Sequence, residues 1–197
     1  MPYTAKQFDL PALKGISEKQ VKVHLALYEG YVKHANLITD MIAAYQKTDD
    51  EGGKYAVAEM RRRFAFEFDG MRMHEYYFSQ FEEKPCAPDE GSALSKLALE
   101  QYGEAGIAGT MKAVAATRGI GWVVVYFDPA AKKLHTTFVG DHELGQLSGL
   151  PVIVALDLWE HAYMVDYVPA EKKSYIDAFF ENLNWAVIEK RFTDAAR

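Results

Sequence analysis

The feature of this chain that most restricts its fold is an acidic residue and a histidine that follow a short apolar run. Residues 152–156 are all apolar and read as a buried strand, Asp157 ends that strand, and His161 comes four residues later. A carboxylate and an imidazole held close together on rigid elements are two natural ligands for a transition metal. The spacing is also typical of an ion pair, or of an N-cap acid beside a core histidine, so by itself it leaves both a structural and a metal-binding role open.

The first half of the sequence predicts two long helices joined by one short loop. Ser17 with Gln20 three residues later is the pattern of a capping box, and apolar side chains then recur at helical spacing as far as about Gln46. The polar segment 48–53 ends this helix, and a second helical pattern runs over residues 54–81. Two long helices with so short a connection are expected to form an antiparallel hairpin.

The second half has shorter elements and predicts a small sheet with helices around it. Residues 122–127 are β-branched and aromatic, which is typical of a strand, and Asp128-Pro129 begins the turn of a β-hairpin. The strands expected are 122–127, 134–139 and 152–156, and the helices expected are 92–101, 105–117 and 170–192.

Prolines and a glycine at residues 84–91 mark the expected domain boundary. The predicted domains are 1–86, an N-terminal arm and helical hairpin, and 87–197, a C-terminal α/β domain that completes any metal site. The predicted fold class is therefore α+β: an N-terminal antiparallel helical hairpin followed by a C-terminal three-stranded antiparallel sheet flanked by helices.

Cysteine content, charge and hydropathy narrow the function further. A single cysteine, Cys86, excludes an internal disulfide framework and any cysteine-based zinc or iron–sulfur site. The 22 basic and 28 acidic residues are spread without blocks, so no nucleic-acid partner is indicated, and an anionic substrate needs local steering against a net charge of -6. No apolar run approaches membrane-spanning length and the first residues do not resemble a signal peptide, so we expect a cytoplasmic protein without a membrane partner.

The histidines of the two predicted helices complete a candidate metal site. His24 and His74 each lie among apolar positions of a helix, where a single histidine is usually a core residue with satisfied hydrogen bonds. Taken with Asp157 and His161, they give three imidazoles and one carboxylate. That set suits iron or manganese with one position left open for substrate or water.

The string at residues 157–167, Asp-Leu-Trp-Glu-His-Ala-Tyr-Met-Val-Asp-Tyr, resembles the DxWEHAYxxDY signature of the iron/manganese superoxide dismutases. The similarity extends from the N-terminal arm to the C-terminus. It also covers His24 after Ile16-Ser17, His74 in His-Glu-Tyr-Tyr-Phe, the Gly-x-Gly-Trp that ends at Trp122, and the pair Asn184-Trp185.

This resemblance implies an enzyme that disproportionates superoxide to dioxygen and hydrogen peroxide. It implies one iron or manganese ion per subunit, cycling between M(III) and M(II), with His24, His74, Asp157 and His161 as the metal ligands. The family uses the same ligands for either metal, so the sequence does not say which one is native.

The resemblance also implies the surroundings of the ion. Trp122 and Trp159 are expected to form the wall of the pocket, a role that agrees with their being buried aromatic residues in any case. Glu160 is expected to cross a twofold interface and hydrogen-bond His161 of the other subunit, with Tyr163 also reaching across. The expected assembly is a homodimer, with a tetramer as the alternative.

One departure from the family pattern concerns the active-site tyrosine, which is expected to pass protons from solvent to the site. In common members it follows the first ligand by eight residues, whereas Tyr31 follows His24 by seven. Seven residues of α-helix turn about 700°, within about 20° of the starting face. Tyr31 therefore suits a regular helix, while an eight-residue spacing needs a π-bulge to reach the same place.

A second departure concerns the glutamine that the family places against the metal-bound solvent, on the second helix or in the loop after the second strand. Gly70 occupies the first location and has no side chain to offer. We assign the role to His142 in the loop, where some members carry a histidine, and expect it to tune the potential of the metal. Gln146 is the second candidate, and a solvent-exposed loop histidine is the alternative interpretation of His142.

Two other functional classes stay open. A metal with a free position can hydrolyse an ester or activate dioxygen, but three histidines and the lack of an evident organic-substrate pocket disfavour this. A non-catalytic relative that keeps the fold for binding or assembly is disfavoured because all four candidate ligands are present.

Overall fold

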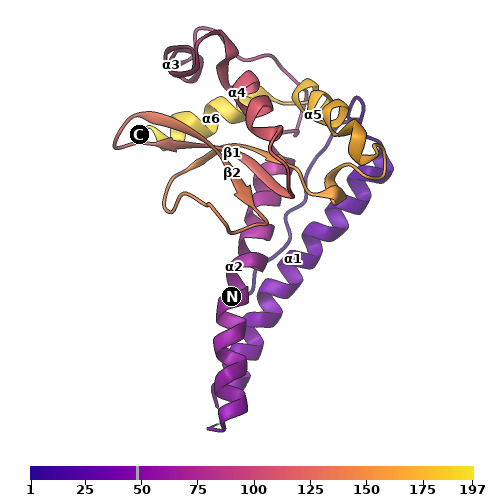
Figure 1. The fold of residues 1–197 in the computed structure, drawn as a ribbon, viewed down its shortest axis with the longest axis vertical. Helices are drawn as coiled ribbons and strands as arrows, with labels where there is room; N and C mark the ends of the chain where they lie inside the picture. The colour runs from indigo at the N-terminus through magenta and orange to yellow at the C-terminus, as the bar shows by residue number, and fades with distance from the viewer. Residues whose placement is uncertain (48) are drawn as a thin grey trace.

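The computed structural model describes residues 1–47 and 49–197, so the first residue of the polar segment predicted to end the first helix lies outside the described residues. Two long helices form an antiparallel hairpin that extends away from the body of the molecule (Figure 1). Helix α1 spans Glu18–Tyr45 and helix α2 spans Glu51–Ser79. The predicted hairpin is confirmed.

The start of α1 differs in one detail from the predicted capping box. Ser17 Oγ accepts the backbone N–H of Gln20 over 3.1 Å, as expected. The Gln20 side chain, however, does not return to the backbone of Ser17, whose N–H donates instead to Asp166 Oδ2. Gln20 forms bonds to another part of the chain because a buried amide satisfies both its donor and its acceptor there.

The three predicted strands form one antiparallel sheet. Strands β1 (Gly121–Asp128), β2 (Lys133–Gly140) and β3 (Val152–Asp157) lie in the order β2-β1-β3. The register pairs Trp122 with Asp157, so the start of the central strand lies beside the end of β3.

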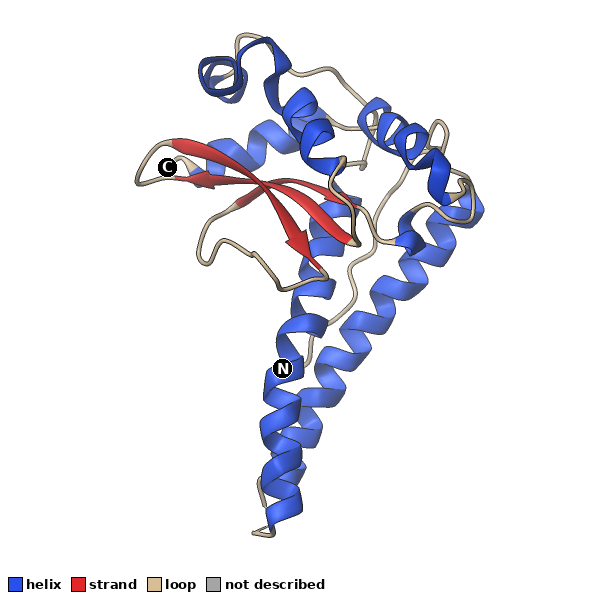
Figure 2. Ribbon diagram, viewed as in Figure 1, coloured by secondary structure: helices blue, strands red, loops and turns tan. Residues whose placement is uncertain are grey.

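Helices cover both faces of this sheet, as Figure 2 shows. Side chains of a strand alternate between faces. Trp122 of β1 packs on Tyr77 of α2, whereas Phe127 of the same strand packs on Phe192, and these two strand positions face opposite sides. The remaining helices are α3 (Ala93–Tyr102), α4 (Gly106–Ala115), α5 (Lys172–Glu181) and α6 (Trp185–Ala195).

The single helix predicted for residues 170–192 is wrong, because residues 182–184 separate α5 from α6. Asn182 bonds through its side chain to the backbone of Lys14, and Asn184 Oδ1 accepts the N–H of Ala186 as the N-cap of α6. Asparagine side chains that bond to the backbone in this way compete with helical hydrogen bonds, so the helix stops and restarts.

The core is continuous from the hairpin to the sheet. The last turns of α2 contribute Met71, Tyr77 and Phe78, which are at most 2% exposed, and α2 packs against β3. The division into domains 1–86 and 87–197 stays a prediction. None of the helices in the described part of the chain is both long and apolar enough to cross a membrane.

Candidate metal centre

Four side chains from both halves of the molecule converge on one point. His24 comes from α1, His74 from α2, Asp157 from the last position of β3, and His161 from the short 3-10 turn η2 (Glu160–Ala162). Their ligand atoms all lie within 4.8 Å of one another, and three of the four residues are buried.

The distances between these atoms fit a single ion. Asp157 Oδ2 lies 3.1 Å from His24 Nε2, 3.3 Å from His161 Nε2 and 3.6 Å from His74 Nε2, and the last two nitrogens are 3.3 Å apart. Ligand atoms about 2.1 Å from one ion lie about 3.0 Å apart at a right angle and about 3.6 Å apart at 120°. Three imidazoles and one carboxylate are a donor set that iron and manganese accept.

The protonation states also favour a metal. Burial lowers the pKa of His24 and of His74, so both imidazoles are neutral and keep a free lone pair. His74 Nδ1 bonds the carbonyl of Gly70 over 2.6 Å, which leaves Nε2 as its free nitrogen. Burial opposes ionisation of Asp157, but the imidazoles of His161 and His24 together hold the pKa of this carboxyl well below its usual value.

Tyr31 and His142 lie next to the four ligands. Helix α1 is α-helical from end to end, so the seven-residue spacing needs no π-bulge, and the Tyr31 ring is 5.1 Å from the ring of His74. Tyr31 Oη lies 2.8 Å from His142 Nε2, and Trp122 Nε1 donates to His142 Nδ1 over 3.0 Å. Because Nδ1 accepts this bond, the proton of neutral His142 is on Nε2 and is donated to the Tyr31 oxygen.

His142 is fully buried, so its interpretation as a solvent-exposed loop residue is wrong. Its ring contacts both Phe66, with centroids 4.6 Å apart, and Trp159, 4.8 Å away. Gln146, the second candidate for the same role, has its amide bonded to Tyr126 Oη and to the carbonyl of His142. The geometry therefore leaves His142 as the loop residue that faces Tyr31.

The comparisons with known proteins agree with this geometry. Residues 91–191, more than half of the chain, match the family described as iron/manganese superoxide dismutases, C-terminal domain. The chain is 33% identical over 190 residues to "Superoxide dismutase (Fe)" of Aquifex aeolicus, which covers 94% of this chain and 88% of that protein. The chain belongs to the iron/manganese superoxide dismutase family.

Other relatives in this family of oxidoreductases are named for manganese or for both metals. "Superoxide dismutase (Mn)" of Haloarcula marismortui is 30% identical over 180 residues, which are 90% of this chain and 86% of that protein. "Superoxide dismutase (Mn/Fe)" of Aeropyrum pernix is 28% identical over 206 residues, with 96% and 92% coverage. Membership of the family therefore does not distinguish iron from manganese.

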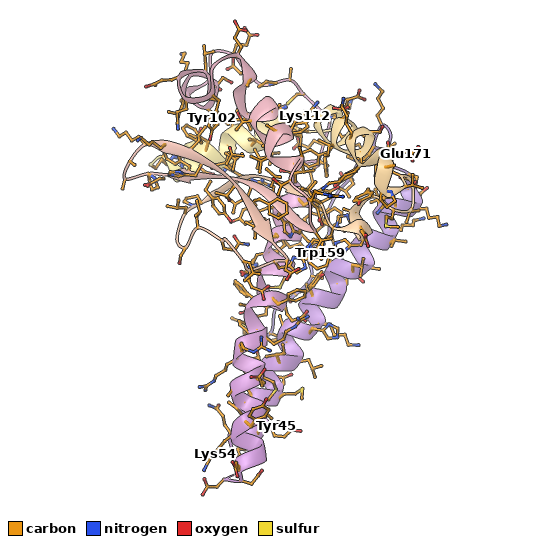
Figure 3. All side chains as sticks on the ribbon, viewed as in Figure 1. Tyr45, Lys54, Tyr102, Lys112, Trp159 and Glu171 are labelled. Atoms are coloured by element: carbon orange, nitrogen blue, oxygen red, sulfur yellow. The ribbon has the colours of Figure 1, made fainter. Side chains whose placement is uncertain are left out.

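Two tryptophans lie next to the four candidate ligands, and their role as the wall of a pocket stays a prediction. Trp122 meets the ring of His74 edge-on at 5.1 Å, and Trp159 stacks on the ring of His161 at 5.6 Å. The backbone N–H of Trp159 donates to Asp157 Oδ1 over 2.8 Å, which fixes the carboxylate. Figure 3 labels Trp159 at the junction of the hairpin and the sheet.

Sequence reasoning missed Phe66, which contacts His142 and Trp159 and lies 6.1 Å from the ring of Tyr31. A signal for it exists, because Phe66, Gly70 and His74 are spaced four residues apart and so share one face of α2.

Glu160 and Tyr163 lie beside the site but have different surroundings. Glu160 is exposed and makes no side-chain hydrogen bond or ion pair within the described residues, where His161 Nδ1 also has no partner. Tyr163 is 4% exposed and stacks on Tyr175 with ring centroids 5.3 Å apart. Within one chain, therefore, Glu160 does not reach His161.

The buried histidines make the stability of the metal-free protein depend on pH. Burial lowers the pKa of His142 to about 4, so folded His142 stays neutral while the unfolded chain binds a proton below pH about 6.5. We expect the free energy of unfolding to fall as the pH drops from about 6.5 to about 4, with up to about 3 kcal/mol from this residue. Urea unfolding of metal-free protein along this range measures it, and a His142→Gln variant should show a shallower slope. Equal slopes would contradict the assignment.

Proposed function

We propose that this chain is a superoxide dismutase that converts two superoxide ions and two protons to dioxygen and hydrogen peroxide. His24, His74, Asp157 and His161 would hold one iron or manganese ion. When bound, that ion supplies one-electron chemistry, taking an electron from one superoxide and giving it to the next. The observation that carries the proposal is the convergence of three imidazole nitrogens on one carboxylate oxygen at distances that fit a single ion.

Proton supply falls to Tyr31 and His142 in this proposal. Burial, aided by the charge of Asp157, raises the pKa of Tyr31, so its hydroxyl keeps its proton at neutral pH. Its oxygen accepts from His142 Nε2, so the hydroxyl proton is free to be donated elsewhere. Tyr31 Oη is thus the atom that passes a proton toward the reduced substrate and takes its replacement from solvent, while His142 Nε2 holds the oxygen in place by its hydrogen bond.

The wall of the pocket would restrict access to a small anion. Trp122, Trp159 and Phe66 surround His142 with aromatic rings. The same wall leaves little room for an organic substrate.

We also propose a cytoplasmic homodimer, with a tetramer as the alternative. The exposed carboxylate of Glu160 and the unpaired Nδ1 of His161 lie on adjacent residues, so a twofold axis nearby would let each subunit complete the other's bond. Met164, three residues after His161, is 48% exposed, which supports an apolar contact there.

The test of the proposed function is metal analysis combined with superoxide decay. We expect protein purified from cells given both metals to hold about one iron or manganese ion per chain and to speed superoxide decay. Removing the metal with a chelator should stop the activity, and restoring it should bring the activity back. Metal-loaded protein that leaves the decay rate unchanged would falsify the proposal.

His142 offers a narrower test. The His142→Ala variant should keep its metal but lose about 10-fold in activity, because the bond to Tyr31 is lost while all four ligands stay. Metal content and superoxide decay are measured on the same sample. His135→Ala, at a half-buried position of β2, is the control and should match the unmodified protein. Complete loss of metal would instead make His142 a ligand or a folding residue.

A further inference from the structure

Two buried glutamines connect the helices of the hairpin to the backbone that carries the other two ligands. Gln20 lies on the first turn of α1, four residues before His24, and Gln80 follows the last turn of α2, six residues after His74. Neither glutamine is more than 1% exposed. Each helix that supplies a histidine thus also supplies a buried amide.

Gln20 bonds to the segment that carries His161. Its Nε2 donates to the backbone carbonyl of His161 over 2.6 Å, and its Oε1 accepts the backbone N–H of Val165 over 2.9 Å. A carbonyl only accepts and an N–H only donates, so these partners fix the orientation of the amide. One side chain therefore holds both ends of the turn that begins at His161.

Gln80 makes the same pair of bonds to strand β3. Its Nε2 donates to the carbonyl of Ala155 over 2.5 Å, and its Oε1 accepts the N–H of the same residue over 3.3 Å. Ala155 lies two residues before Asp157, so its backbone position decides where the carboxylate points.

The segment around His161 is also held to the second half of the chain, since Trp159 Nε1 donates to the carbonyl of Asp141 and Tyr163 stacks on Tyr175. The bonds of Gln20 tie it to the hairpin. The turn η2 has three residues, too few for regular hydrogen bonds to set its position relative to another element. The neighbouring link, from the N–H of Ser17 to Asp166, is exposed to water, whereas both bonds of Gln20 are shielded. Metal ligands need to be held within about 0.5 Å of the productive geometry, so the shielded bonds matter most.

We propose that Gln20 and Gln80 are positioning residues for the metal centre. They fix the positions of Asp157 and His161 relative to the two histidines of the hairpin before an ion binds. They do so through the backbone, without contacting a ligand atom. The inference rests on the proposed metal site. It adds two residues that are not metal ligands but hold the backbone of the ligands in place.

The test compares two variants with a matched control. Gln20→Met and Gln80→Met keep the volume of the side chain and remove both bonds. The control is Asn36→Leu, because Asn36 of α1 makes the same two bonds, over 2.7 and 2.8 Å, with the backbone of Tyr3 in the N-terminal arm. We expect both glutamine variants to release bound iron or manganese to a chelator about 10-fold to 100-fold faster than the unmodified protein.

Asn36→Leu should lower the unfolding temperature to a similar extent yet release metal at the unmodified rate. Should Gln20→Met fail to fold, Gln20→Glu keeps the volume and the acceptor for Val165 but sets a carboxylate oxygen against the carbonyl of His161, so it should also release metal faster than the unmodified protein. Release rates for the glutamine variants equal to that of Asn36→Leu would overturn the positioning role.

A second readout needs no metal. In the metal-free protein, hydrogen exchange at the amide of Val165 should be faster in Gln20→Met, and exchange at the amide of Ala155 should be faster in Gln80→Met, with neither changed in Asn36→Leu. Unchanged exchange at both amides would count against the inference alone. Failure of the unmodified protein to bind either metal would refute the proposed function instead, so the two failures are distinguishable.

Discussion

The Asp157→Ala variant is expected to lose both its metal and its superoxide dismutase activity. Asp157 Oδ2 is the one anionic atom among the four converging ligand atoms, and all three imidazole nitrogens lie within 3.6 Å of it. Without it, three imidazole nitrogens face a cation of charge two or three with no anionic ligand to compensate that charge. We expect bound metal to fall below about a tenth of the unmodified level and superoxide decay to slow by at least about 1,000-fold.

The same substitution removes a structural bond. Asp157 Oδ1 accepts the N–H of Trp159, so the turn that leads to His161 loses its anchor as well. Metal content, superoxide decay and thermal unfolding of the metal-free form are measured together. Asp177→Ala is the matched control, because the one ion pair of this half-exposed acid among the described residues is with Lys112, and its removal should change none of the three by much. An Asp157→Ala protein that keeps its metal would show that another group supplies the fourth ligand.

The sequence predicted the elements of the fold because their signals are local. Helical spacing of apolar residues marked α1 and α2, and β-branched runs marked β1 and β3, so each of these was found within a few residues of its observed ends. The exception is the tail, where Asn182 and Asn184 end one helix and begin the next. Their effect depends on bonds to Lys14 and Glu82, distant in the sequence, which no local pattern shows.

The sequence predicted the candidate metal site only when its four residues were considered together. Asp157 and His161 alone fit a structural pair, and His24 and His74 alone fit core histidines, but the fold brings all four within 4.8 Å. The sequence could not predict the hydrogen bonds that hold these four residues in place. Gln20 was expected to complete a capping box, since that is the usual local partner, and only the packing of the two halves shows that its amide reaches the turn at His161.

Gly70 lies at the closest approach of α2 to the active-site tyrosine, and the Gly70→Ala variant should be both less stable and less active. A Cβ at this position would lie 2.7 Å from Cδ1 of Tyr31 and 2.9 Å from its Cε1. Replacing glycine by alanine inside a helix favours folding by about 1 kcal/mol. Overpacking a core costs about 1 to 3 kcal/mol, so a net loss of about 1 kcal/mol is expected, with the tyrosine ring pushed out of place.

Displacing that ring should break its 2.8 Å bond to His142 and lower superoxide decay by about 100-fold while the four ligands keep their metal. Urea unfolding, metal analysis and superoxide decay of Gly70→Ala measure the three effects. Gly30→Ala on α1 is the matched control, because a Cβ there has nothing within 4 Å, and it should gain about 1 kcal/mol with unchanged activity.

A double-mutant cycle separates the contact with Tyr31 from any other effect at Gly70. In a Tyr31→Ala background the ring is absent, so adding Gly70→Ala should stabilise the protein by about 1 kcal/mol, as at Gly30, rather than destabilise it. A stability loss that persists in this background would assign the strain to another neighbour. A reversal of sign would show that α2 carries glycine here because the ring of Tyr31 occupies the space that a side chain would need.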